Sequence, residues 1–540
     1  MDEGTARLKA LMAGRGFPHL AGDMQCIETH ISWVVLAGDF AYKFKKPLDL
    51  GFLDYSTLAL RKQACEDELR LNRRTAPSIY LDVVALRGTA AAPRINGDGP
   101  VLDYAVRMRR FDQDQVFDAL LARDALTPDL IDAVGVHVAA LHGSAAVAEV
   151  GGEFGTPQAV HAPASQNFEQ IRDRLADGAI HARVAALEQW SDAAFQRLRD
   201  TFARRLADGR VRECHGDLHL GNLVVCDGQA RLFDGIEFNP HLRWTDVIAD
   251  TAFLVMDLLA HGREDLAGRF LDVWLQETGD YEGVAVLRYY LVYRAMVRAK
   301  IAAIRLGQAG AQKCDRDAFM RYLSLAERLT VPGQRGLVIG CGVSGSGKSV
   351  SSQTLVEGAG FIRLRSDVER KRLFGLAPLA SSASVLAGGI YTADASAQTY
   401  ARLLFLAGNV LDAGYPVFVD ATFCRHAQRE PFTQLAARLD TPCLIAWFDA
   451  PPALLQQRVV ARLGAGADVS EADLAVLESQ LASFEVPDEV ADGVRVLKLD
   501  TSKSDASQVL RDAVAQWLAG VAGADSGVPL HTNRSNPDGA

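Results

Sequence analysis

The residues best suited to chemistry form one segment in the second half of the chain, Gly342-Val343-Ser344-Gly345-Ser346-Gly347-Lys348-Ser349. It fits the pattern G-x-x-x-x-G-K-S and lies between a strand-like apolar run and a helix-like one. The backbone N–H groups of such a loop surround a phosphate, and the helix that follows adds partial positive charge. We predict a nucleotide site in which Lys348 reaches the β- and γ-phosphates and the Ser349 hydroxyl binds Mg²⁺.

A carboxylate and a guanidinium follow the next strand-like run, residues 361–364. Asp367 and Arg370 are three residues apart, which is about one helical turn if a helix begins here. Asp367 could accept the proton of an attacking hydroxyl, while Arg370 holds the substrate or its phosphate. The alternative interpretation of Asp367 is a helix N-cap.

Three further charged residues complete the predicted site. Asp420 ends the run 417–419, where a carboxylate would order Mg²⁺. Arg458 and Arg462 lie at i, i+4 on a predicted helix, and a glycine-bearing run, 463–466, follows them. The arrangement is typical of a lid that closes over the transferring phosphoryl group, although a solvated helix face explains it equally well.

The first half of the chain carries a second constellation. His215, Asp217 and Asn222 match H-x-D-x-x-x-x-N, and a hairpin-like run then leads to Asp234 in Phe-Asp-Gly. We predict that Asp217 accepts the hydroxyl proton and that Asn222 and Asp234 bind Mg²⁺ against a triphosphate. A zinc site on His215 and His219 is disfavoured, because no Glu follows His215 and the segment has a loop-like composition.

Such a site also needs a lysine on a strand and a glutamate on the next helix. Lys43 and Lys45 alternate on one face of the predicted strand 40–45, and Glu66 and Glu68 lie in the predicted helix 56–74. We favour Lys43 with Glu68, and leave Lys45 and Glu66 as alternatives. No G-x-G-x-x-G loop precedes the lysine strand.

These motifs divide the chain into two domains. A Pro/Gly break at residues 330–335 separates a helical run from the strand-like 337–341, so we predict a first domain over 1–329 and a second over 336–519. The remainder, 520–540, is rich in Gly, Pro, Ser and Asn, and we predict that it is disordered.

Composition narrows the class of protein. Apolar residues make up 49% and charged residues 23% of 540 residues, which is typical of globular proteins, and the net charge of −10 disfavours a chain whose whole surface binds nucleic acid or an anionic membrane. The eight cysteines are scattered, and the N-terminus lacks the pattern of a signal peptide. We therefore expect reduced thiols, a cytoplasmic location and no membrane segment.

The second domain resembles the small P-loop kinases of the polynucleotide-kinase, zeta-toxin and gluconate-kinase group. The resemblance rests on the glycine-rich loop, Asp367 and Arg370, Asp420 and the lid arginines. It implies an α/β domain with a mostly parallel five-stranded sheet that transfers phosphoryl groups. Residues 361–375 contain five basic residues, which would suit a phosphorylated or polynucleotide substrate or, equally, a basic helix face.

Residues 25–325 resemble the aminoglycoside phosphotransferase and choline-kinase branch of the protein-kinase-like fold. The resemblance rests on His215-Gly216-Asp217, Asn222 and Asp234, and it implies a small sheet-containing lobe and a larger helical one. By the same resemblance, Asp246 and Asp250 support the catalytic loop. The whole chain looks like bacterial proteins that join an aminoglycoside phosphotransferase-like domain to a P-loop ATP-binding domain.

We therefore expect an α+β protein-kinase-like domain followed by an α/β P-loop domain. Each would bind ATP and Mg²⁺, and a hydroxyl of a small molecule would accept the phosphoryl group. One alternative is a nucleotide-binding regulatory protein in which one domain is not catalytic, and another is a polynucleotide 5′-end kinase in the second domain. The identity of the acceptor and the oligomeric state stay open.

Overall fold

A computed structural model of the chain describes residues 3–49, 53–175, 177–307, 312–382, 389–465, 469–489 and 494–525. Its backbone contacts divide it into two compact units: residues 1–263 with 286–330, and residues 264–285 with 331–540. The chain passes from the first unit to the second between Thr330 and Val331. Residues 264–285 differ from the expectation, because they fall within the predicted first domain but pack with the second unit.

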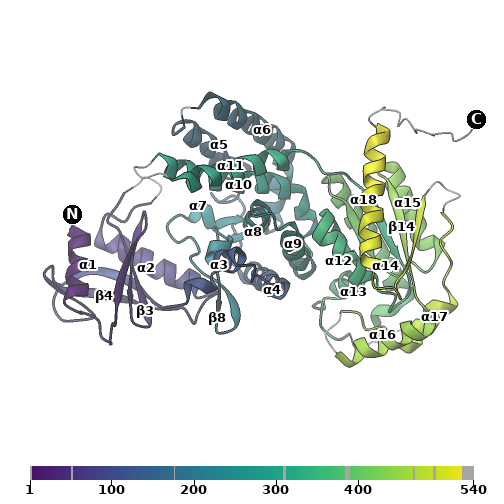
Figure 1. Cartoon of the computed structure of the whole chain (residues 1–540), viewed down its shortest axis with the longest axis horizontal. Helices are drawn as coiled ribbons and strands as arrows, with labels where there is room; N and C mark the ends of the chain where they lie inside the picture. The colour runs from purple at the N-terminus through teal and green to yellow at the C-terminus, as the bar shows by residue number, and fades with distance from the viewer. Residues whose placement is uncertain are drawn as a thin grey trace, which may run out of the picture. The chain divides into compact units, whose positions relative to one another are not determined.

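The first unit begins with a six-stranded sheet in the order β1-β2-β3-β6-β4-β5, in which every pair is antiparallel. Helix α1 (Glu3–Ala13) precedes it and helix α2 (Leu58–Asn72) interrupts it (Figure 1). The strands are β1 (Met24–Glu28), β2 (Ser32–Ala37), β3 (Phe40–Lys45), β4 (Tyr80–Thr89), β5 (Ala92–Ile95) and β6 (Val101–Arg109).

The period-two pattern of β3 decides which of its side chains face α2. Tyr42 and Phe44 join the apolar cluster that includes Leu8 and Leu11 of α1, whereas Ala41 joins the cluster with Cys65 of α2. Lys43 and Lys45 have the same parity as Ala41, so both project toward α2. The sheet therefore delivers two lysines to the helix that carries Glu68.

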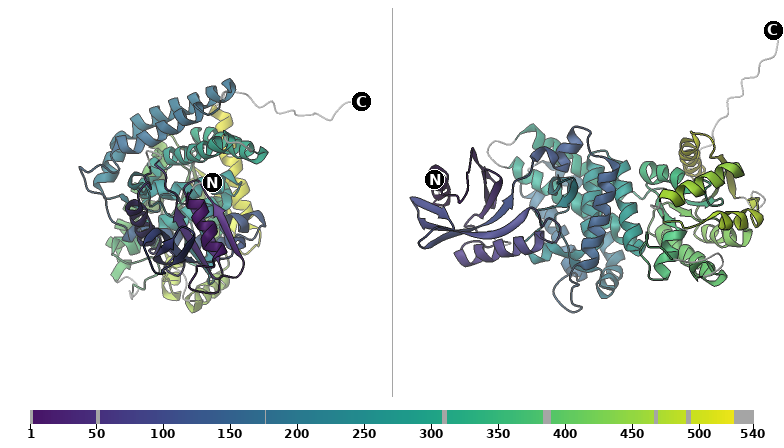
Figure 2. Two further views of the ribbon diagram at one scale, coloured as in Figure 1. Left: turned by 90° about the vertical axis from the view of Figure 1, so that its left-hand side faces the viewer. Right: turned by 90° about the horizontal axis from the view of Figure 1, so that it is seen from below.

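Helices make up most of the remaining first unit (Figure 2). They are α3 (Phe117–Ala122), α4 (Pro128–Ser144), α5 (Pro157–Arg172), α6 (Gly178–Ala207), α7 (Pro240–Arg243), α8 (Val247–Ala260), α10 (Val284–Leu306, whose first two residues group with the second unit) and α11 (Lys313–Thr330). Short strands frame the predicted catalytic loop: β7 (Val211–Glu213) pairs with β10 (Trp244–Asp246), and β8 (Leu223–Cys226) pairs with β9 (Gln229–Leu232).

The second unit is built on a five-stranded sheet, in the order β12-β13-β11-β14-β15, whose neighbours all pair in parallel. Its strands are β11 (Leu337–Cys341), β12 (Ile362–Arg365), β13 (Val417–Asp420), β14 (Cys443–Asp449) and β15 (Arg495–Asp500). The central strand β11 is buried at every position, which explains its continuous apolar sequence. Since parallel strands end at one edge of the sheet, this order gathers the predicted site residues there.

The helices of this unit precede, connect and follow these strands. They are α9 (Glu264–Thr278), α12 (Lys348–Ala359), α13 (Ser366–Leu373), α14 (Ala393–Asp412), α15 (His426–Arg438), α16 (Pro452–Ala465), α17 (Leu474–Ala482) and α18 (Ala506–Asp525). The backbone of α18 is helical for the first six residues of the segment 520–540, for which we predicted disorder. The remainder, 526–540, and Gly466 of the predicted lid run lie outside the described residues.

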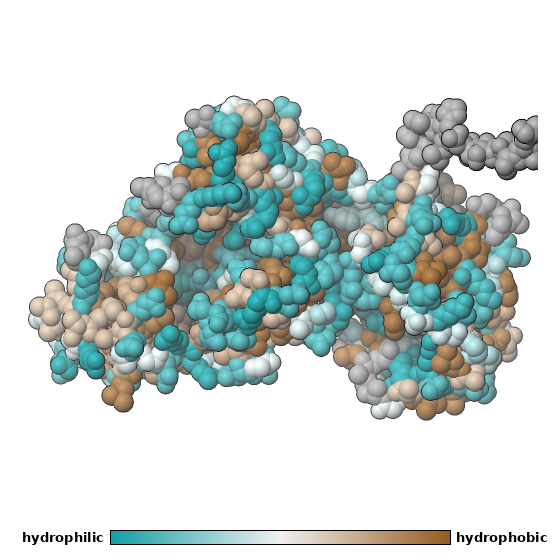
Figure 3. Space-filling model, in the orientation of Figure 1, coloured by the Kyte–Doolittle hydropathy of each residue, from teal (hydrophilic) through white to brown (hydrophobic). Residues whose placement is uncertain are grey.

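The observed architecture confirms the predicted fold class. The first unit consists of an antiparallel sheet with a helix, followed by a larger helical part. The second contains a parallel sheet whose first strand in the chain, β11, leads into the glycine-rich loop. Within the part of the chain that the structure describes, no helix has both the length and the apolar composition needed to cross a membrane. On the face drawn in Figure 3, hydrophilic side chains predominate and hydrophobic ones form scattered patches.

Candidate active sites

The glycine-rich loop connects β11 to α12 and surrounds the Lys348 ammonium. Lys348 Nζ donates to the carbonyl oxygens of Gly342, at 2.7 Å, and Val343, at 3.1 Å. Gly345 and Gly347 adopt φ values of +79° and +86°, in the left-handed region that other residues rarely enter. The sequence therefore folds into the compact loop that the motif predicts.

Ser349 and Asp420 meet at the base of this loop. Ser349, in the first turn of α12, donates from Oγ to Asp420 Oδ2 at 2.6 Å. Asp420 is the last residue of β13, and it pairs with Gly340 of the neighbouring strand β11. A hydroxyl and a carboxylate oxygen at the phosphate loop are ligands that Mg²⁺ accepts, so the residues present fit that ion.

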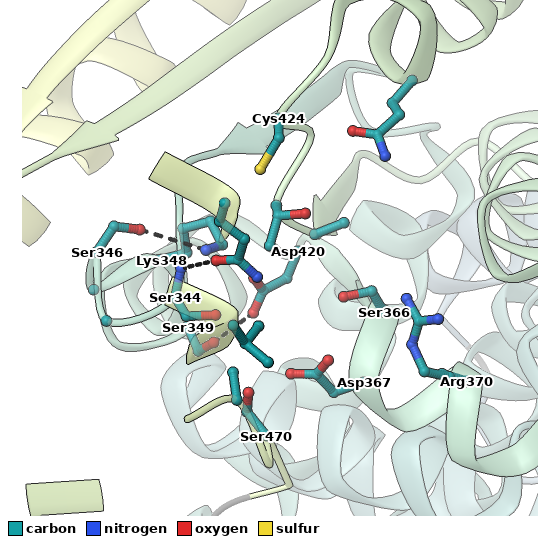
Figure 4. A pocket seen from close by; sticks show the side chains of 18 of the residues that line it. Ser344, Ser346, Lys348, Ser349, Ser366, Asp367, Arg370, Asp420, Cys424 and Ser470 are labelled. Atoms are coloured by element: carbon teal, nitrogen blue, oxygen red, sulfur yellow. Dashed lines mark hydrogen bonds between the residues drawn. The ribbon is translucent and has the colours of Figure 1, made fainter. Parts of the chain in front are cut away.

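The loop forms one wall of a cavity of about 1280 Å³, and Asp367 and Arg370 line it as well. In Figure 4 the Asp367 carboxylate points toward Ser349, while Arg370 lies on the far side of Asp367. Arg370 donates to the Ile390 carbonyl at 3.1 Å and to Ser396 Oγ at 3.2 Å. Its Nε is buried and has no hydrogen-bond partner among the described residues.

The two arginines of the predicted lid lie one turn apart on α16, and both line the cavity. Arg458 donates to the carbonyl of Gly345 at 3.2 Å and to Thr501 Oγ1 at 3.0 Å, which joins α16 to the phosphate loop. Arg462 donates to the Ala472 carbonyl at 2.7 Å. The helix thus brings two cations to the cavity that Lys348 lines.

One residue that lines this cavity, Gln480, could not be identified from the sequence. Gln480 on α17 accepts, through Oε1, a hydrogen bond from the backbone N–H of Ser344 at 2.7 Å. This N–H belongs to the loop that would bind phosphate. A glutamine on a helix surface carries no local signal of such a contact, because the contact depends on tertiary packing.

The basic run 361–375 makes contacts within its own unit rather than a solvent-facing basic surface. Each of its five basic side chains has a hydrogen bond or ion pair there: Arg363 with Asp272, Arg365 with Gln276, Arg370 with Ser396, Lys371 with Glu471, and Arg372 with Glu369. The residue composition of this run is therefore explained without a polynucleotide.

In the first unit, Lys43 joins two carboxylates that are distant in sequence. Its Nζ lies 2.8 Å from Glu68 Oε1 and 2.5 Å from Asp234 Oδ1. Burial would lower the pKa of Lys43, but Asp234 and then Glu68 raise it well above its usual value. Asp234 has φ +60°, a conformation that costs a non-glycine residue of order 1–3 kcal/mol. Lys43 is therefore charged and placed beside a predicted metal ligand.

Lys45 occupies a different, fully enclosed position. It pairs with Glu68 and with Glu237, and Tyr55 donates to Glu237 Oε1 at 2.7 Å. The side-chain exposure of Lys45 is 0%, against 13% for Lys43. Glu66, the other candidate partner, faces Lys62 at 3.4 Å instead. The structure thus places Lys43 nearer the predicted metal residues and Lys45 in the interior.

The loop between β7 and β8 places Asp217 beside Asn222. Asn222 donates from Nδ2 to the carbonyl of Asp217 at 2.9 Å and to its Oδ2 at 3.0 Å. His219 Nε2 lies 3.4 Å from the same Oδ2. Burial would raise the pKa of Asp217, but His219 lowers it below the usual value, so the carboxylate is ionised.

A buried aspartate, Asp250, holds the backbone of this loop. Asp250 on α8 accepts backbone N–H bonds from His215, at 3.1 Å, and Gly216, at 2.8 Å. Burial would raise the pKa of Asp250, but its hydrogen bond from His142 helps to lower it to about 2. Asp246, the other expected support, pairs instead with Arg205 at 2.6 Å.

The histidines considered for zinc have other partners. His215 Nε2 lies 3.0 Å from the Phe233 carbonyl, and His219 Nδ1 accepts from the Gly221 N–H at 3.1 Å. Asn222 and Asp234, the residues expected to bind Mg²⁺ through oxygen, both follow Asp217 in the chain. The Asp234 side chain is 45% exposed. Amide and carboxylate oxygens suit that ion better than zinc.

The chain is similar to several known proteins. A family model described as "AAA domain" matches residues 337–487. "Uncharacterized protein Rv2004c" of Mycobacterium tuberculosis (strain ATCC 25618 / H37Rv) is 30% identical over 466 residues, which cover 85% of this chain and 90% of the relative.

Two solved structures each align with part of the chain. A choline/ethanolamine kinase family protein from Mesorhizobium loti covers 61% of this chain and 95% of its own, with 12% identity and a TM-score of 0.37. A putative kinase from Chloroflexus aurantiacus covers 34% of this chain and 98% of its own, with 20% identity and a TM-score of 0.29.

Proposed function

The chain belongs to the family of the Mycobacterium tuberculosis relative Rv2004c, and we propose that it is an ATP-dependent phosphotransferase. Each unit would bind Mg–ATP, and the γ-phosphoryl group would pass to a hydroxyl of a small molecule. The observation that carries the proposal is one cavity lined by the phosphate loop, Ser349 with Asp420, and Asp367. Residues suited to bind phosphate, to bind a metal ion and to accept a hydroxyl proton therefore line the same cavity.

In the second unit, chemistry would follow from positioning. Lys348 and the loop N–H groups hold the phosphates. Asp367 takes the proton of the acceptor hydroxyl as its oxygen bonds to the γ-phosphorus, and the bond from that phosphorus to the β,γ-bridging oxygen breaks to release ADP. Ser349 and Asp420 would hold Mg²⁺, which when bound neutralises charge on the phosphates. Arg370 lines the same cavity as Asp367, so its guanidinium would contact an anionic or polar group of the acceptor.

In the first unit, Asp217 would act as the base and Lys43 would contact the phosphates. Asn222 and Asp234 would hold the metal ion. Glu68 would keep Lys43 in place, since the two are joined at 2.8 Å. Asp250 would fix the backbone of the loop through its bonds to His215 and Gly216.

The test is transfer of label from ATP radiolabelled at the γ-phosphate into fractionated metabolite pools. We expect labelled products other than inorganic phosphate, of which Asp217→Asn removes one set and Lys348→Ala another. Products that survive both substitutions unchanged would contradict the proposal. So would nucleotide binding with no labelled product in any pool, the result expected of a regulatory protein.

A further inference from the structure

Helix α9 contributes to the second unit although its sequence lies between α8 and α10 of the first. Residues 264–285 group with the second unit, where α9 packs on α12 and β12. The approach is close, since a Cβ atom on Gly268 would lie 2.2 Å from the carbonyl oxygen of Val356 in α12. Gly268 therefore allows this helix to contact the backbone that follows the phosphate loop.

Two residues on one face of α9 meet two arginines on one face of β12. Asp272 Oδ2 lies 2.5 Å from Arg363 Nη2, and Arg363 Nε donates to its other oxygen at 3.3 Å. Gln276, one turn later, accepts from Arg365 Nη1 at 3.3 Å and donates to Asp272 Oδ2 at 2.6 Å. We call these four residues, Asp272, Gln276, Arg363 and Arg365, the α9 bracket.

The arginines of the α9 bracket contact both residues assigned to the metal. Arg363 Nη1 donates to the backbone carbonyl of Ser349 at 3.0 Å. Arg365 Nε lies 3.9 Å from Asp420 Oδ2. Ser349 and Asp420 are themselves joined at 2.6 Å. A single arginine side chain thus links each proposed ligand of the ion to α9.

Burial makes the bracket sensitive to the loss of either partner. Asp272 is 5% exposed and Arg363 is 6% exposed, so neither charge is compensated by bulk water. Arg363 also donates to Ser352 Oγ and to Gln353 Oε1 in α12. Without Asp272, the guanidinium would be left with neutral acceptors only, and we expect its side chain to move away from Ser349.

We propose that Asp272 and Gln276 are positioning residues of the P-loop site, which hold Ser349 and Asp420 in the geometry that binds Mg²⁺ with ATP. The inference rests on the proposed function, because it assumes that this site binds Mg–ATP. It makes a helix encoded within the first domain part of the second unit's active site. A second domain that begins at residue 331 would lack this support.

The test measures ATP affinity with and without Mg²⁺ in the full chain, in a Lys43→Met background that removes the phosphate-binding lysine of the first site. We expect Asp272→Asn to weaken Mg–ATP binding about tenfold, which is about 1.4 kcal/mol, and metal-free ATP binding less than about threefold. Gln276→Leu should act in the same direction. The control is Glu282→Gln, because Glu282 is 54% exposed and faces Arg402 at 3.8 Å.

Thermal unfolding of each variant separates a loss of positioning from a loss of fold. If Asp272→Asn does not fold, Gln276→Leu still tests the inference, because it leaves the buried ion pair of Asp272 with Arg363 intact. Asp272→Glu should recover part of the Mg²⁺-dependent affinity. Equal losses with and without Mg²⁺, or variants that match Glu282→Gln, would overturn the inference alone. A background chain that binds no ATP would instead overturn the proposed function and the inference with it.

Discussion

Lys43 and Asp234, 191 residues apart in the chain, meet with Nζ and Oδ1 separated by 2.5 Å. One residue lies on a strand of the six-stranded sheet and the other follows the hairpin of β8 and β9. Their pairing brings a cation suited to phosphate next to a carboxylate suited to a metal ion. It also distinguishes Lys43 from Lys45, which shares its strand face but not its access to solvent.

We predict opposite consequences for removal of the two lysines. Lys43→Met should abolish nucleotide binding at the first site with a small effect on stability, because Asp234 is 45% exposed and buried Glu68 keeps its pairing with Lys45. Lys45→Met should lower the free energy of unfolding by about 3–5 kcal/mol, because Glu237 would stay buried without its cation. Urea unfolding and ATP binding in a Lys348→Ala background measure the two effects. Equal destabilisation by both substitutions would contradict this distinction.

Stability should fall at acidic pH through Glu237. Burial would raise the pKa of Glu237, but Lys45 and Lys43 lower it from 4.5 to about 2. Because the native pKa is the lower one, the stabilisation is complete above about pH 4.5 and is lost as the pH falls toward 2. We expect Glu237→Gln to be less stable at neutral pH and to show a flatter decline in unfolding free energy between pH 5 and 3. A variant that declines as steeply as the wild type would rule out this contribution.

Asp367→Asn should separate catalysis from binding in the second unit. If Asp367 accepts the hydroxyl proton, its loss lowers phosphoryl transfer about 10²–10⁴-fold while Mg–ATP affinity changes little. Asp394→Asn is the matched control, because Asp394 is exposed and lies in the first turn of α14. The alternative interpretation of Asp367 as a helix N-cap is wrong, because Arg365 is the N-cap of α13 and Asp367 is its second residue. If Asp367 only favours the first turn of this helix, its substitution should instead reduce stability and leave the rate per folded molecule unchanged.

Gln480→Ala should strengthen nucleotide binding. Gln480 Oε1 already accepts a hydrogen bond from the N–H of Ser344. A phosphate that uses this donor must therefore displace the Gln480 side chain. Release of one hydrogen bond, worth about 1 kcal/mol, predicts about fivefold tighter binding of ATP. Calorimetry with Lys348→Ala as the negative control measures the change. Weaker binding by Gln480→Ala would show that the amide contacts the nucleotide instead.

The sequence predicted the parts of both sites that are local in the chain. The run from Gly342 to Ser349 folds as its spacing requires, and β11 has the predicted bounds, Leu337–Cys341. Asp217 and Asn222 contact each other because they lie only five positions apart in one loop. Such contacts need no knowledge of the tertiary fold.

Contacts that depend on tertiary packing could not be predicted in this way. Lys43 and Lys45 share a strand face, and only the positions of Asp234 and Glu237 distinguish their environments. Helix α9 has an ordinary amphipathic sequence, which does not indicate the unit on which it packs. Its Asp272 gains a role only because Arg363 lies opposite.

A site in each unit is tested most simply by the number of Mg²⁺-bound molecules of a non-hydrolysable ATP analogue held per chain, obtained by equilibrium dialysis. We expect about two for the wild type, about one for Lys43→Met, about one for Lys348→Ala and none for the double variant. A wild-type chain that binds one or none would contradict a site in each unit. So would a double variant that still binds the analogue.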